Sequence, residues 1–496
     1  MVIRHICAFS GKGYRVSEQP HESPSSRAEG FAGFLERRFH LSSLRTDPKT
    51  EVAAGLTTFM VMAYIIFVNP IILSNADLPI SATTTATALV AGTLTIIMGL
   101  ATNRAYAIAP GMGLNAIVAF QLVGQMGLSA PEAMGVVVSS GILILVLVLA
   151  GVRKWVMEVV PLELKQGIAI GIGLFILFIG LINGRIVVAD PDTFVAMGDL
   201  RGVPVFITGV GLVLTIALMS MNFRGAILWG ILGSTAIAVA ARSITGTDEF
   251  VPGQAELPTQ WIASPDFSRI GDFSFGFFLE LGILTAFLVV IGLMMADFFD
   301  TMGTLIGVGS QAGYLDEKGE LPEAQRALLV DSLGTIGGGA ASASSATTYI
   351  ESSAGVGVGG RSGLVSVVVG VLFLVSMPLW PIVGMVPTEA TAPALIIVGW
   401  MMMGVLTERT YTTPEGREIK MGGIDFTDIE KGLPVVAAMV IMPLTYNITN
   451  GIGAGFVIYS LVKIFRGKAR EVHPVMHLIS LLFLIYFLRT FLGVDL

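Results

Sequence analysis

The segment Leu293-Met-Met-Ala-Asp297-Phe-Phe-Asp300-Thr301 places two acidic residues inside an otherwise apolar stretch. A carboxylate at the depth of a lipid bilayer is unfavourable by about 2.5 to 3.5 kcal/mol on insertion scales, so such residues face protein or a watery cavity. Intramembrane acids usually mark the place where a membrane protein binds or moves its substrate. The segment therefore predicts both a membrane fold and a functional site.

The composition of the 496-residue chain supports a membrane fold. Hydrophobic residues make up 53% of the chain and charged residues 13%, and the mean hydropathy is +0.79. A soluble domain carries about 25% charged residues. Apolar runs of the length that a spanning helix needs alternate with short polar connections, whereas a membrane β-barrel would show short alternating strands. We therefore predict an all-α polytopic membrane protein.

The apolar runs predict about fourteen transmembrane helices in two sets of seven. A cytosolic arm (1–50) without a signal peptide precedes the first seven-span repeat (51–243), a polar extracellular loop (244–274) and the second repeat (275–466). The C-terminal segment (467–496) contains an apolar stretch that either lies on the membrane surface or crosses it. The spans are expected near 54–74, 80–100, 110–125, 132–151, 164–182, 203–221, 224–243, 276–305, 327–340, 344–358, 362–384, 389–406, 432–447 and 450–466.

Basic residues predict the orientation in the membrane. Most of them fall in connections on the side of the N-terminus, and the opposite connections hold Arg185, Arg201, Arg242 and Arg269. Positive charge is typical of cytoplasmic loops, so we expect a cytoplasmic N-terminus and a place in the plasma membrane, the inner membrane of the cell. The single cysteine, Cys7, cannot form a disulfide within the chain.

The two sets of spans resemble each other in sequence. Three pairs of short strings recur at separations of 226 to 233 residues: Val160-Pro161-Leu-Glu163 with Val386-Pro387-Thr-Glu389, Val203-Pro204-Val205 with Leu433-Pro434-Val435, and 54–63 with 285–296. Because seven is odd, the second set enters the membrane with the opposite orientation. This arrangement is the inverted repeat of secondary transporters, which bind substrate near the midplane between the repeats.

One span in each set has a sequence that interrupts a helix. Ala109–Phe120 begins with Pro110 and two glycines, and Ala343–Gly355 is rich in serine, threonine and alanine between glycine-rich flanks. Glycine, serine and threonine lower helix propensity, and interrupted helices line transporter binding sites. Asn115 and Glu351 fall at nearly equivalent places in these two segments.

Asp297, Asp300 and Glu351 are candidates to converge on one cavity. The two aspartates lie three residues apart and therefore share a helix face. The five histidines, His5, His21, His40, His473 and His477, lie outside the central spans. If protons are coupled to transport, carboxylates must carry them, and we expect no metal and no cofactor.

Structural interpretations of the same residues stay open at this point. Asp297 and Asp300 could cap a broken helix or pair with a buried polar group, and Glu351 and Asn115 could serve helix N-termini. Tyr349 suits either packing or stacking on a flat ligand. Helix-start or structural roles are favoured for Glu163, Glu389 and Asp331.

Four strings resemble the nucleobase-cation symporters of the xanthine/uracil permease superfamily, and more closely their adenine/guanine/hypoxanthine permease branch. They are Gly55–Pro70, Gly111-Met-Gly-Leu-Asn115-Ala, Asp297-Phe-Phe-Asp300-Thr-Met-Gly-Thr304 and Ser342–Gly355, and the resemblance covers about residues 35–490. It implies fourteen spans, short extended strands in spans 3 and 10, and membership in a family whose proteins are often dimers. It also implies a core domain of spans 1–4 and 8–11 beside a gate domain of spans 5–7 and 12–14.

The resemblance also implies the site residues. The family's substrate-binding residues carry over to Asn115, Asp297 and Glu351, with Asp300 as the second acid of the pair and Tyr349 as a less direct match. The chain departs from the xanthine and uracil members by having aspartate rather than glutamate in span 8, which disfavours those substrates without excluding them.

We therefore expect a transporter that imports purine nucleobases (hypoxanthine, guanine, adenine) by proton symport, with Asp300 and Asp297 coupling the proton. Its partners would be the base, the proton, the lipid bilayer and a second copy in a homodimer, and no nucleic acid. A uracil/xanthine permease of the same superfamily and an inorganic-anion transporter of the same fold are the alternatives. An intramembrane aspartyl protease would need acids on facing helices, and a serine protease would need a membrane histidine.

Overall fold

A computed structural model describes residues 31–151, 159–247, 249–316, 321–322, 324–406, 409–412, 418–421 and 423–492. Several sequence-based predictions concern residues outside these ranges. They are the greater part of the N-terminal arm with Cys7, and the basic residues Arg153, Lys154, Lys318 and Arg417.

The first half of the chain contains seven membrane-crossing units after one surface helix. The surface helix is α2 (Phe31–Phe39), and its Leu35 and Phe39 pack against Leu364. The units are α3–α4–η1 (Pro48–Met62, Ile65–Leu73, Ser74–Ala76), α5 (Ile80–Thr102), β1–α6–η2 (Ile108–Pro110, Met112–Ala116, Ile117–Gln125), α7 (Ala130–Leu149), α9 (Leu162–Asn183), α10 (Val203–Ser220) and α11 (Ala226–Thr245). The hairpin β2–β3 (Val187–Asp190, Phe194–Met197) joins α9 to α10.

The second half repeats this order of elements. After α12 (Phe277–Leu281) come α13 (Ile283–Ala312), α14 (Ala324–Ala340), β4–α15 (Ala346–Thr348, Ser352–Val358), α16–η3–α17 (Gly363–Ser376, Met377–Leu379, Trp380–Gly384), α18–η4 (Thr388–Met402, Met403–Leu406), α19 (Ile429–Leu444) and α20 (Ile448–Phe465). The hairpin β5–β6 (Arg409–Thr412, Glu418–Met421) precedes α19, and η5 (Ala469–Glu471) and α21 (Pro474–Leu492) end the chain. In both halves the third unit begins with a strand, so the fold is an inverted repeat of seven.

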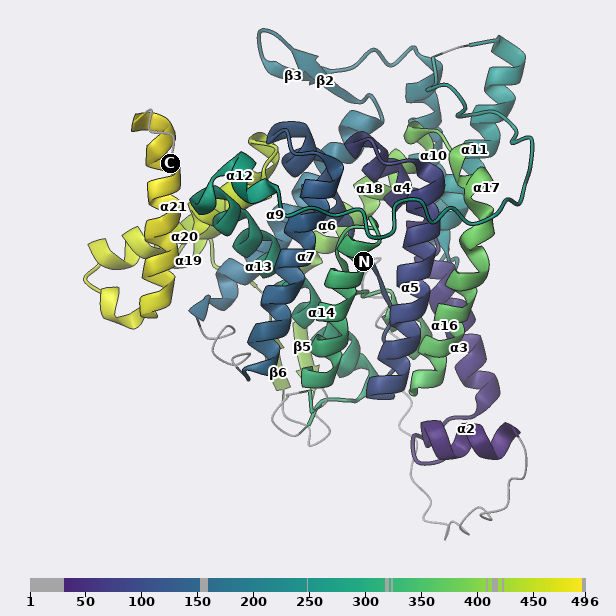
Figure 1. The fold of residues 1–496 in the computed structure, drawn as a ribbon, viewed down its shortest axis with the longest axis horizontal. Coiled ribbons are helices and arrows are strands. Elements are labelled where there is room, and N and C mark those ends of the chain that lie inside the picture. Colours follow the sequence, from purple (N-terminus) through teal and green to yellow (C-terminus); the bar gives the residue numbers. More distant parts are fainter. Residues whose placement is uncertain are drawn as a thin grey trace.

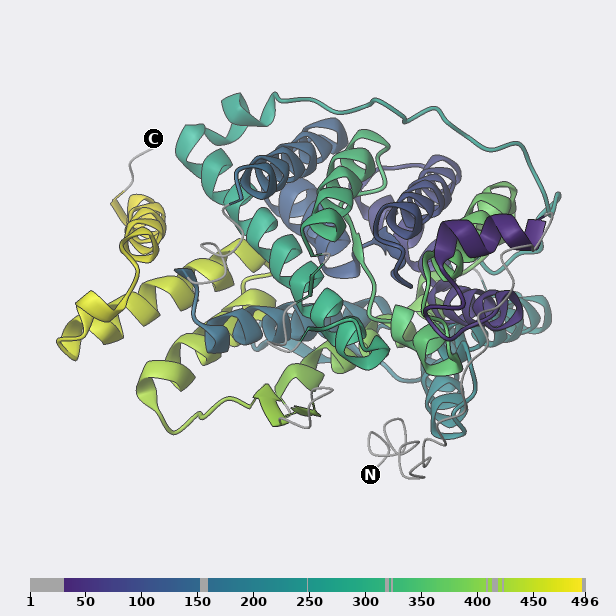
Figure 2. The same ribbon diagram turned by 90° about the horizontal axis from the view of Figure 1, so that it is seen from below.

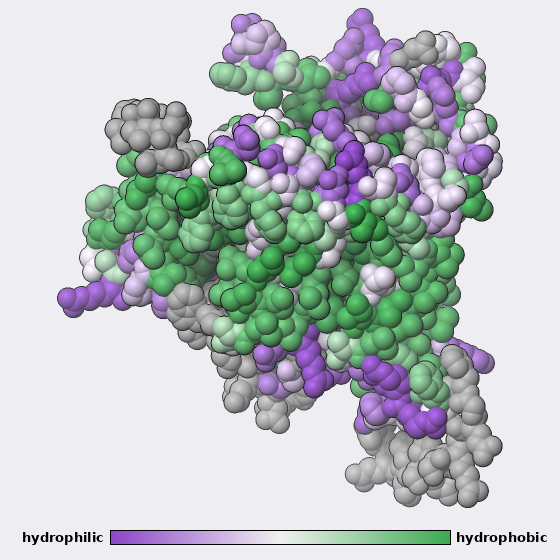
Figure 3. Space-filling model, viewed as in Figure 1, coloured by the Kyte–Doolittle hydropathy of each residue, from purple (hydrophilic) through white to green (hydrophobic). Residues whose placement is uncertain are grey.

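The surface of the molecule matches a bilayer. Figure 3 shows a hydrophobic belt across the middle of one face, with hydrophilic residues gathered above and below it. Among the described residues, nine helical segments are long and apolar enough to cross a membrane, and Met112–Gln125, Thr388–Met402 and Pro474–Leu488 are shorter apolar helices. In Figure 1 the hairpin β2–β3 lies at the top of the molecule, and α2 and β5–β6 lie toward the bottom. These elements therefore lie on opposite sides of the belt.

The predicted spans agree with the observed elements within a few residues, except at two places. The first unit begins at Pro48 rather than near residue 54. The prediction of one span at 276–305 was wrong, because α12 and α13 are separate helices and α13 continues to Ala312. Gly282 separates them with φ 71° and ψ 157°, a conformation that is essentially restricted to glycine. The last apolar stretch forms α21, which packs against α20 and α13 at the edge of the molecule farthest from α3 and α16 (Figure 2).

The long connection at 244–274 is tied to the helices that it crosses. Ser81 at the start of α5 donates a hydrogen bond to Asp266 (2.7 Å), and the Asp266 amide donates to Thr85 (3.0 Å). The hydrogen bonds from the Ser81 and Ser268 side chains lower the pKa of Asp266 below its usual value, because they stabilise the ionised carboxylate.

The helices pack in two groups that share few contacts. The first group is α3, α4, α5, α6, α7, α13, α14, α15 and α16, and the second is α9, α10, α11, α18, α19 and α20. The groups meet mainly where α13 touches α9 and α20, where α6 touches α9, and where α11 touches α3. Because α6 belongs to one interrupted segment and α13 packs against β4 and α15 of the other, the interface between the groups passes beside both.

Within the first group, α5 and α16 approach each other through glycines. A Cβ atom on Gly99 would lie 2.5 Å from the carbonyl oxygen of Gly363, and one on Gly370 would lie 2.5 Å from the carbonyl oxygen of Gly92. Small residues allow helix backbones to pack closely in membranes, where van der Waals contact replaces the hydrophobic effect.

We predict that Gly99→Ala destabilises the protein by about 1–3 kcal/mol, because the added methyl group overlaps the Gly363 backbone. Gly209→Ala in α10 is the matched control, since no atom of the described residues lies within 4 Å of its new Cβ. The measurement is thermal unfolding of both purified variants in detergent. Equal midpoints for the two variants would contradict the close packing of α5 and α16.

Candidate functional site

Two antiparallel strands in the centre of the molecule form the framework of the site. β1 and β4 pair in the register Ile108↔Thr348, Ala109↔Thr347 and Pro110↔Ala346. Two further backbone hydrogen bonds extend the pairing, Gly111 N to Ser345 O and Tyr349 N to Ala107 O, each 2.9 Å. The strands are short because Pro110 has no N–H to continue the ladder of hydrogen bonds, and because each strand is followed closely by a helix.

A short helix leaves each strand in an opposite direction. α6 begins after Gly111 and carries Asn115, whose backbone N–H donates to the Gly111 carbonyl oxygen (2.8 Å). α15 begins after Glu351 at the far end of β4. The two residues that the sequence places at nearly equivalent points of the repeat therefore flank one strand pair, from opposite ends.

Helix α13 runs alongside β4 and brings in the acidic pair. The Ser345 hydroxyl donates to Asp297 Oδ2 (2.9 Å), and one turn later the Thr301 and Thr347 hydroxyls are hydrogen-bonded (2.6 Å). Asp297 is completely buried. Asp300 is partly exposed and lies within electrostatic range of both Asp297 and Glu351. Both aspartates therefore lie on α13, which packs beside β4, and Glu351 lies at the end of that strand, while the convergence of the three acids on one cavity stays a prediction.

Glu351 and Tyr349 are both held by hydrogen bonds. The hydroxyl of Tyr64, between α3 and α4, donates to Glu351 Oε1 (2.7 Å). The Tyr349 hydroxyl donates to the carbonyl oxygen of Pro110, so its ring bridges the two strands. Glu351 is 8% exposed and Tyr349 is 5% exposed.

Asn115 and Asp297 carry polar atoms that the protein leaves unpaired. Neither the Oδ1 nor the Nδ2 atom of Asn115 has a hydrogen-bond partner among the described residues, although the side chain is completely buried. Asp297 Oδ1 is also buried and without a partner in that part of the chain. Burying such groups unpaired is unfavourable by about 1–3 kcal/mol each, so native structures rarely do so without a reason. A ligand that pairs these atoms provides one.

The structure decides several of the open alternatives. α13 is continuous through Asp297 and Asp300, so neither acid caps a helix end. The side chains of Asn115 and Glu351 make no capping hydrogen bond within the described residues. Asp297 does pair with buried hydroxyl groups, as one structural interpretation expected.

The acids expected to be structural are engaged in structural contacts. Glu163 and Glu389 lie in the first turns of α9 and α18, and they form ion pairs with Lys431 (3.2 Å) and Arg185 (3.0 Å). Asp331 of α14 accepts hydrogen bonds from the Thr348 amide (3.0 Å), the Thr348 hydroxyl (3.1 Å) and the Thr301 hydroxyl (2.7 Å).

Three residues that hydrogen-bond to the acids were not predicted from the sequence. Tyr64 contacts Glu351 across 287 residues, and Thr335 and Ser345 contact Asp297 across 38 and 48 residues. Tyr64 lies in the Gly55–Pro70 string, one of the four strings that carry the family resemblance. Its place in that string was the one sequence feature that indicated a role for Tyr64. Thr335 and Ser345 are single hydroxyl groups in segments full of small residues.

Beside α6, side chains of the two helix groups are hydrogen-bonded to each other. Gln121 Nε2 donates to the Thr449 hydroxyl (2.7 Å), and Asn447 Nδ2 donates to Gln125 Oε1 (2.7 Å). Tyr446, in the same connection between α19 and α20, packs edge-on against Phe120 and Phe175, with ring centroids 5.6 and 5.2 Å apart. These contacts join η2 to the second helix group.

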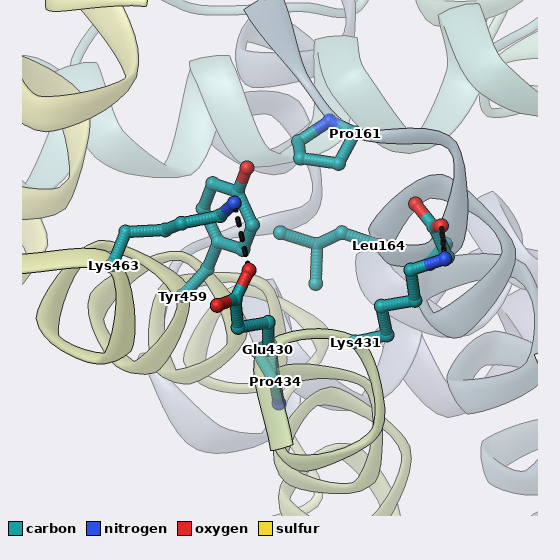
Figure 4. Close-up of a pocket in the computed structure, with 8 residues that line it drawn as sticks. Pro161, Leu164, Glu430, Lys431, Pro434, Tyr459 and Lys463 are labelled. Carbon is teal, nitrogen blue, oxygen red and sulfur yellow. Dashed lines mark ion pairs between the residues drawn. The ribbon is translucent and has the colours of Figure 1, made fainter. Parts of the chain in front are cut away.

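A pocket of about 190 Å³ lies elsewhere, between the start of α9, the start of α19 and the end of α20. Figure 4 shows Lys431 and Lys463 directed toward carboxylates in this pocket. Lys431 pairs with Glu163 (3.2 Å) and Lys463 pairs with Glu430 (2.9 Å). Because these charged side chains already have partners, we place the candidate site at Asn115 and Asp297, whose buried polar atoms have no partner among the residues that the structure describes. Over the described ranges, no group of acids, histidines or cysteines is arranged to hold a metal ion.

Comparison with known proteins agrees with this architecture. The family Xan_ur_permease, described as "Permease family", matches residues 49–411. The putative permease MJ0326 of Methanocaldococcus jannaschii is 40% identical over 92% of this chain and 98% of its own length. The guanine/hypoxanthine permease PbuO of Bacillus subtilis (39%; 90% and 99%) and the adenine permease AdeP of Escherichia coli K12 (38%; 91% and 96%) are similarly related.

Solved structures with the same fold are more distant in sequence. The transmembrane domain of the cyanobacterial bicarbonate transporter BicA has a TM-score of 0.56 at 15% identity, over 82% of this chain and 97% of that domain. The murine anion transporter Slc26a9 in its inward-facing state has a TM-score of 0.56 at 13% identity, over 92% of this chain and 77% of that one. These likenesses show the fold alone. The family match and the relatives of nearly equal length together show that this chain is a multi-pass membrane protein of the permease family, a transporter and not an enzyme, in the branch that the sequence resemblance indicated.

Proposed function

We propose that the protein imports purine nucleobases, hypoxanthine, guanine or adenine, by proton symport with alternating access. The observation that carries the proposal is that Asn115 and Asp297, both buried beside the strand pair, have polar atoms without a partner in the described part of the chain. Relatives of this chain are named as guanine/hypoxanthine and adenine permeases, which supports the choice of purines.

The chemistry of the unpaired atoms suits the edge of a purine. Asn115 offers a donor and an acceptor side by side, and Asp297 Oδ1 offers an acceptor. Hypoxanthine and guanine present a ring N–H beside a carbonyl oxygen, and adenine presents an amino group beside a ring nitrogen. Either edge complements an amide side chain, and a second ring N–H complements the carboxylate. Glu351 would bind the base as well, with Tyr349 packed beside it.

Asp300 is our candidate for proton coupling, together with Asp297. It has partial exposure and lies near two other carboxylates, Asp297 and Glu351. Three acids in a low-dielectric region repel one another when all are ionised, so taking up a proton relieves the repulsion. Protonation and substrate binding would thereby be coupled.

Alternating access would come from movement of the first helix group against the second, as the core and gate domains. The two groups share few contacts, and the site lies on the first group next to their interface. Breaking the hydrogen bonds of Gln121 with Thr449 and of Gln125 with Asn447 would open one path to the site.

We further propose a plasma-membrane location with a cytoplasmic N-terminus, and a homodimer.

An inorganic anion is the competing substrate class, because the fold is shared with a bicarbonate transporter. The candidate site opposes that assignment. Asp297 leaves one carboxylate oxygen buried and without a partner in the described part of the chain, and Asp300, three residues further along α13, lies within electrostatic range of both Asp297 and Glu351. An anion placed there would be repelled by these carboxylates when they are ionised.

Uptake of labelled bases tests the proposal directly. In cells that lack their own permeases, we expect accumulation of at least one of hypoxanthine, guanine and adenine, greater at the lower external pH and abolished by a protonophore. Uracil, xanthine and bicarbonate serve as comparison substrates. If no purine accumulates while uracil, xanthine or bicarbonate does, the purine assignment is wrong.

Two acid-to-amide variants separate binding from coupling. Glu351→Gln keeps an acceptor for the Tyr64 hydroxyl but removes the charge, and we expect it to weaken purine binding at least about 100-fold. Asp300→Asn should retain binding and flatten the pH dependence of uptake. Glu163→Gln, at the start of α9, is the control and should behave as wild type. Unchanged transport in the first two variants would remove both acids from the site.

Cross-linking tests the movement of the two helix groups. In a Cys7→Ser background, Gln121→Cys with Thr449→Cys should be joined by a short bifunctional thiol reagent, since the native side chains are hydrogen-bonded. We expect cross-linking to stop uptake and cleavage of the linker to restore it. The single-cysteine variants control for labelling alone. Full uptake by the cross-linked protein would show that transport does not require these groups to separate.

A further inference from the structure

The two carboxylate oxygens of Asp297 have different surroundings. Oδ2 accepts hydrogen bonds from the hydroxyls of Thr335 in α14 (2.5 Å) and of Ser345 just before β4 (2.9 Å). These two hydroxyls are themselves within hydrogen-bonding distance (3.1 Å), and both side chains are completely buried. Oδ1 has no partner in the described part of the chain.

This asymmetry fixes the direction in which Asp297 presents its free oxygen. Turning the carboxylate about its last side-chain bond would break two short hydrogen bonds at once. With Oδ2 held by α14 and by the β4 segment, Oδ1 alone is available, and it can only accept a hydrogen bond while the carboxylate is ionised. A buried acceptor in this state is complemented by an N–H group from outside the chain.

The neighbouring acid, Asp331, shows the opposite arrangement. Its Oδ1 accepts from the amide and the hydroxyl of Thr348, and its Oδ2 accepts from Thr301. Both oxygens of Asp331 therefore have partners within the protein, and these hydrogen bonds hold β4 against α14. Of these two buried acids, only Asp297 has a carboxylate oxygen without a hydrogen-bond partner among the described residues.

We propose that Thr335 and Ser345 are positioning residues of the substrate site, which hold one oxygen of Asp297 so that the other accepts a ring N–H of the base. This inference rests on the proposed function and deepens it. It assigns to two small hydroxyl residues part of the selectivity for bases that carry an N–H at the position facing Asp297. A base methylated at that nitrogen would be rejected.

The test is purine binding and uptake by Thr335→Val and Ser345→Ala. Valine has nearly the shape of threonine but cannot donate, and we expect each variant to raise Kd and KM about tenfold with Vmax little changed. Thr335→Ser restores the hydroxyl and should return the affinity to near the wild-type value. Thr235→Val is the matched control, because the Thr235 hydroxyl bonds within its own helix, to the Ile231 carbonyl oxygen, and should leave binding unchanged.

The outcomes separate this inference from the proposed function. A wild-type protein that binds no purine in detergent and transports none overturns both. If the wild type binds purine and Thr335→Val and Ser345→Ala bind equally well, the positioning role alone is wrong. If Thr335→Ser loses as much affinity as Thr335→Val while its thermal unfolding midpoint matches the wild type, the hydroxyl is not the cause and the inference is also overturned.

Discussion

Backbone groups cannot remain unpaired in the hydrocarbon core of a membrane, and this constraint organises the centre of the protein. The third and tenth crossing units are interrupted, and each interruption exposes N–H and C=O groups that a continuous helix would pair. The two interruptions satisfy each other through the antiparallel strands β1 and β4. At the outer edge of β1, the Thr95 hydroxyl accepts from the Ile108 amide and donates to the Ile108 carbonyl oxygen, each at 2.9 Å.

The site is a consequence of that pairing. Because β1 and β4 run in opposite directions, Asn115 and Glu351 are presented from opposite ends of one strand pair, and α13 packs along β4 so that Asp297 lies beside Ser345. Hydroxyl side chains then bind most of the buried carboxylate oxygens. Among the buried polar atoms that lack a partner in the described residues, those of Asn115 and Asp297 lie beside this strand pair, and a substrate bound there would pair them. The stability of this region and its ability to bind a substrate therefore both depend on which buried polar groups have hydrogen-bond partners.

The sequence predicts the fold well because its signals are local. The length of each apolar run determines a span, and glycine, proline and serine mark both interruptions within a few residues of β1 and β4. The division of span 8 could not be predicted, because the separation of α12 from α13 depends on the backbone conformation of Gly282, and glycines are also common within the uninterrupted spans.

The site is only partly predictable. Asn115, Asp297, Asp300 and Glu351 stand out because polar residues are rare in apolar spans. Their partners do not, since a hydroxyl group such as that of Thr335 is common in membrane helices and its contact with Asp297 depends on how α13 and α14 pack.

The most direct measurement is an experimental structure of the protein with hypoxanthine or guanine bound, determined in lipid. The account predicts density for the purine ring beside β1 and β4, with the Asn115 amide and Asp297 Oδ1 each within hydrogen-bonding distance of the base. A base bound elsewhere, with Asn115 and Asp297 paired to other groups of the protein, would contradict the assignment of the site.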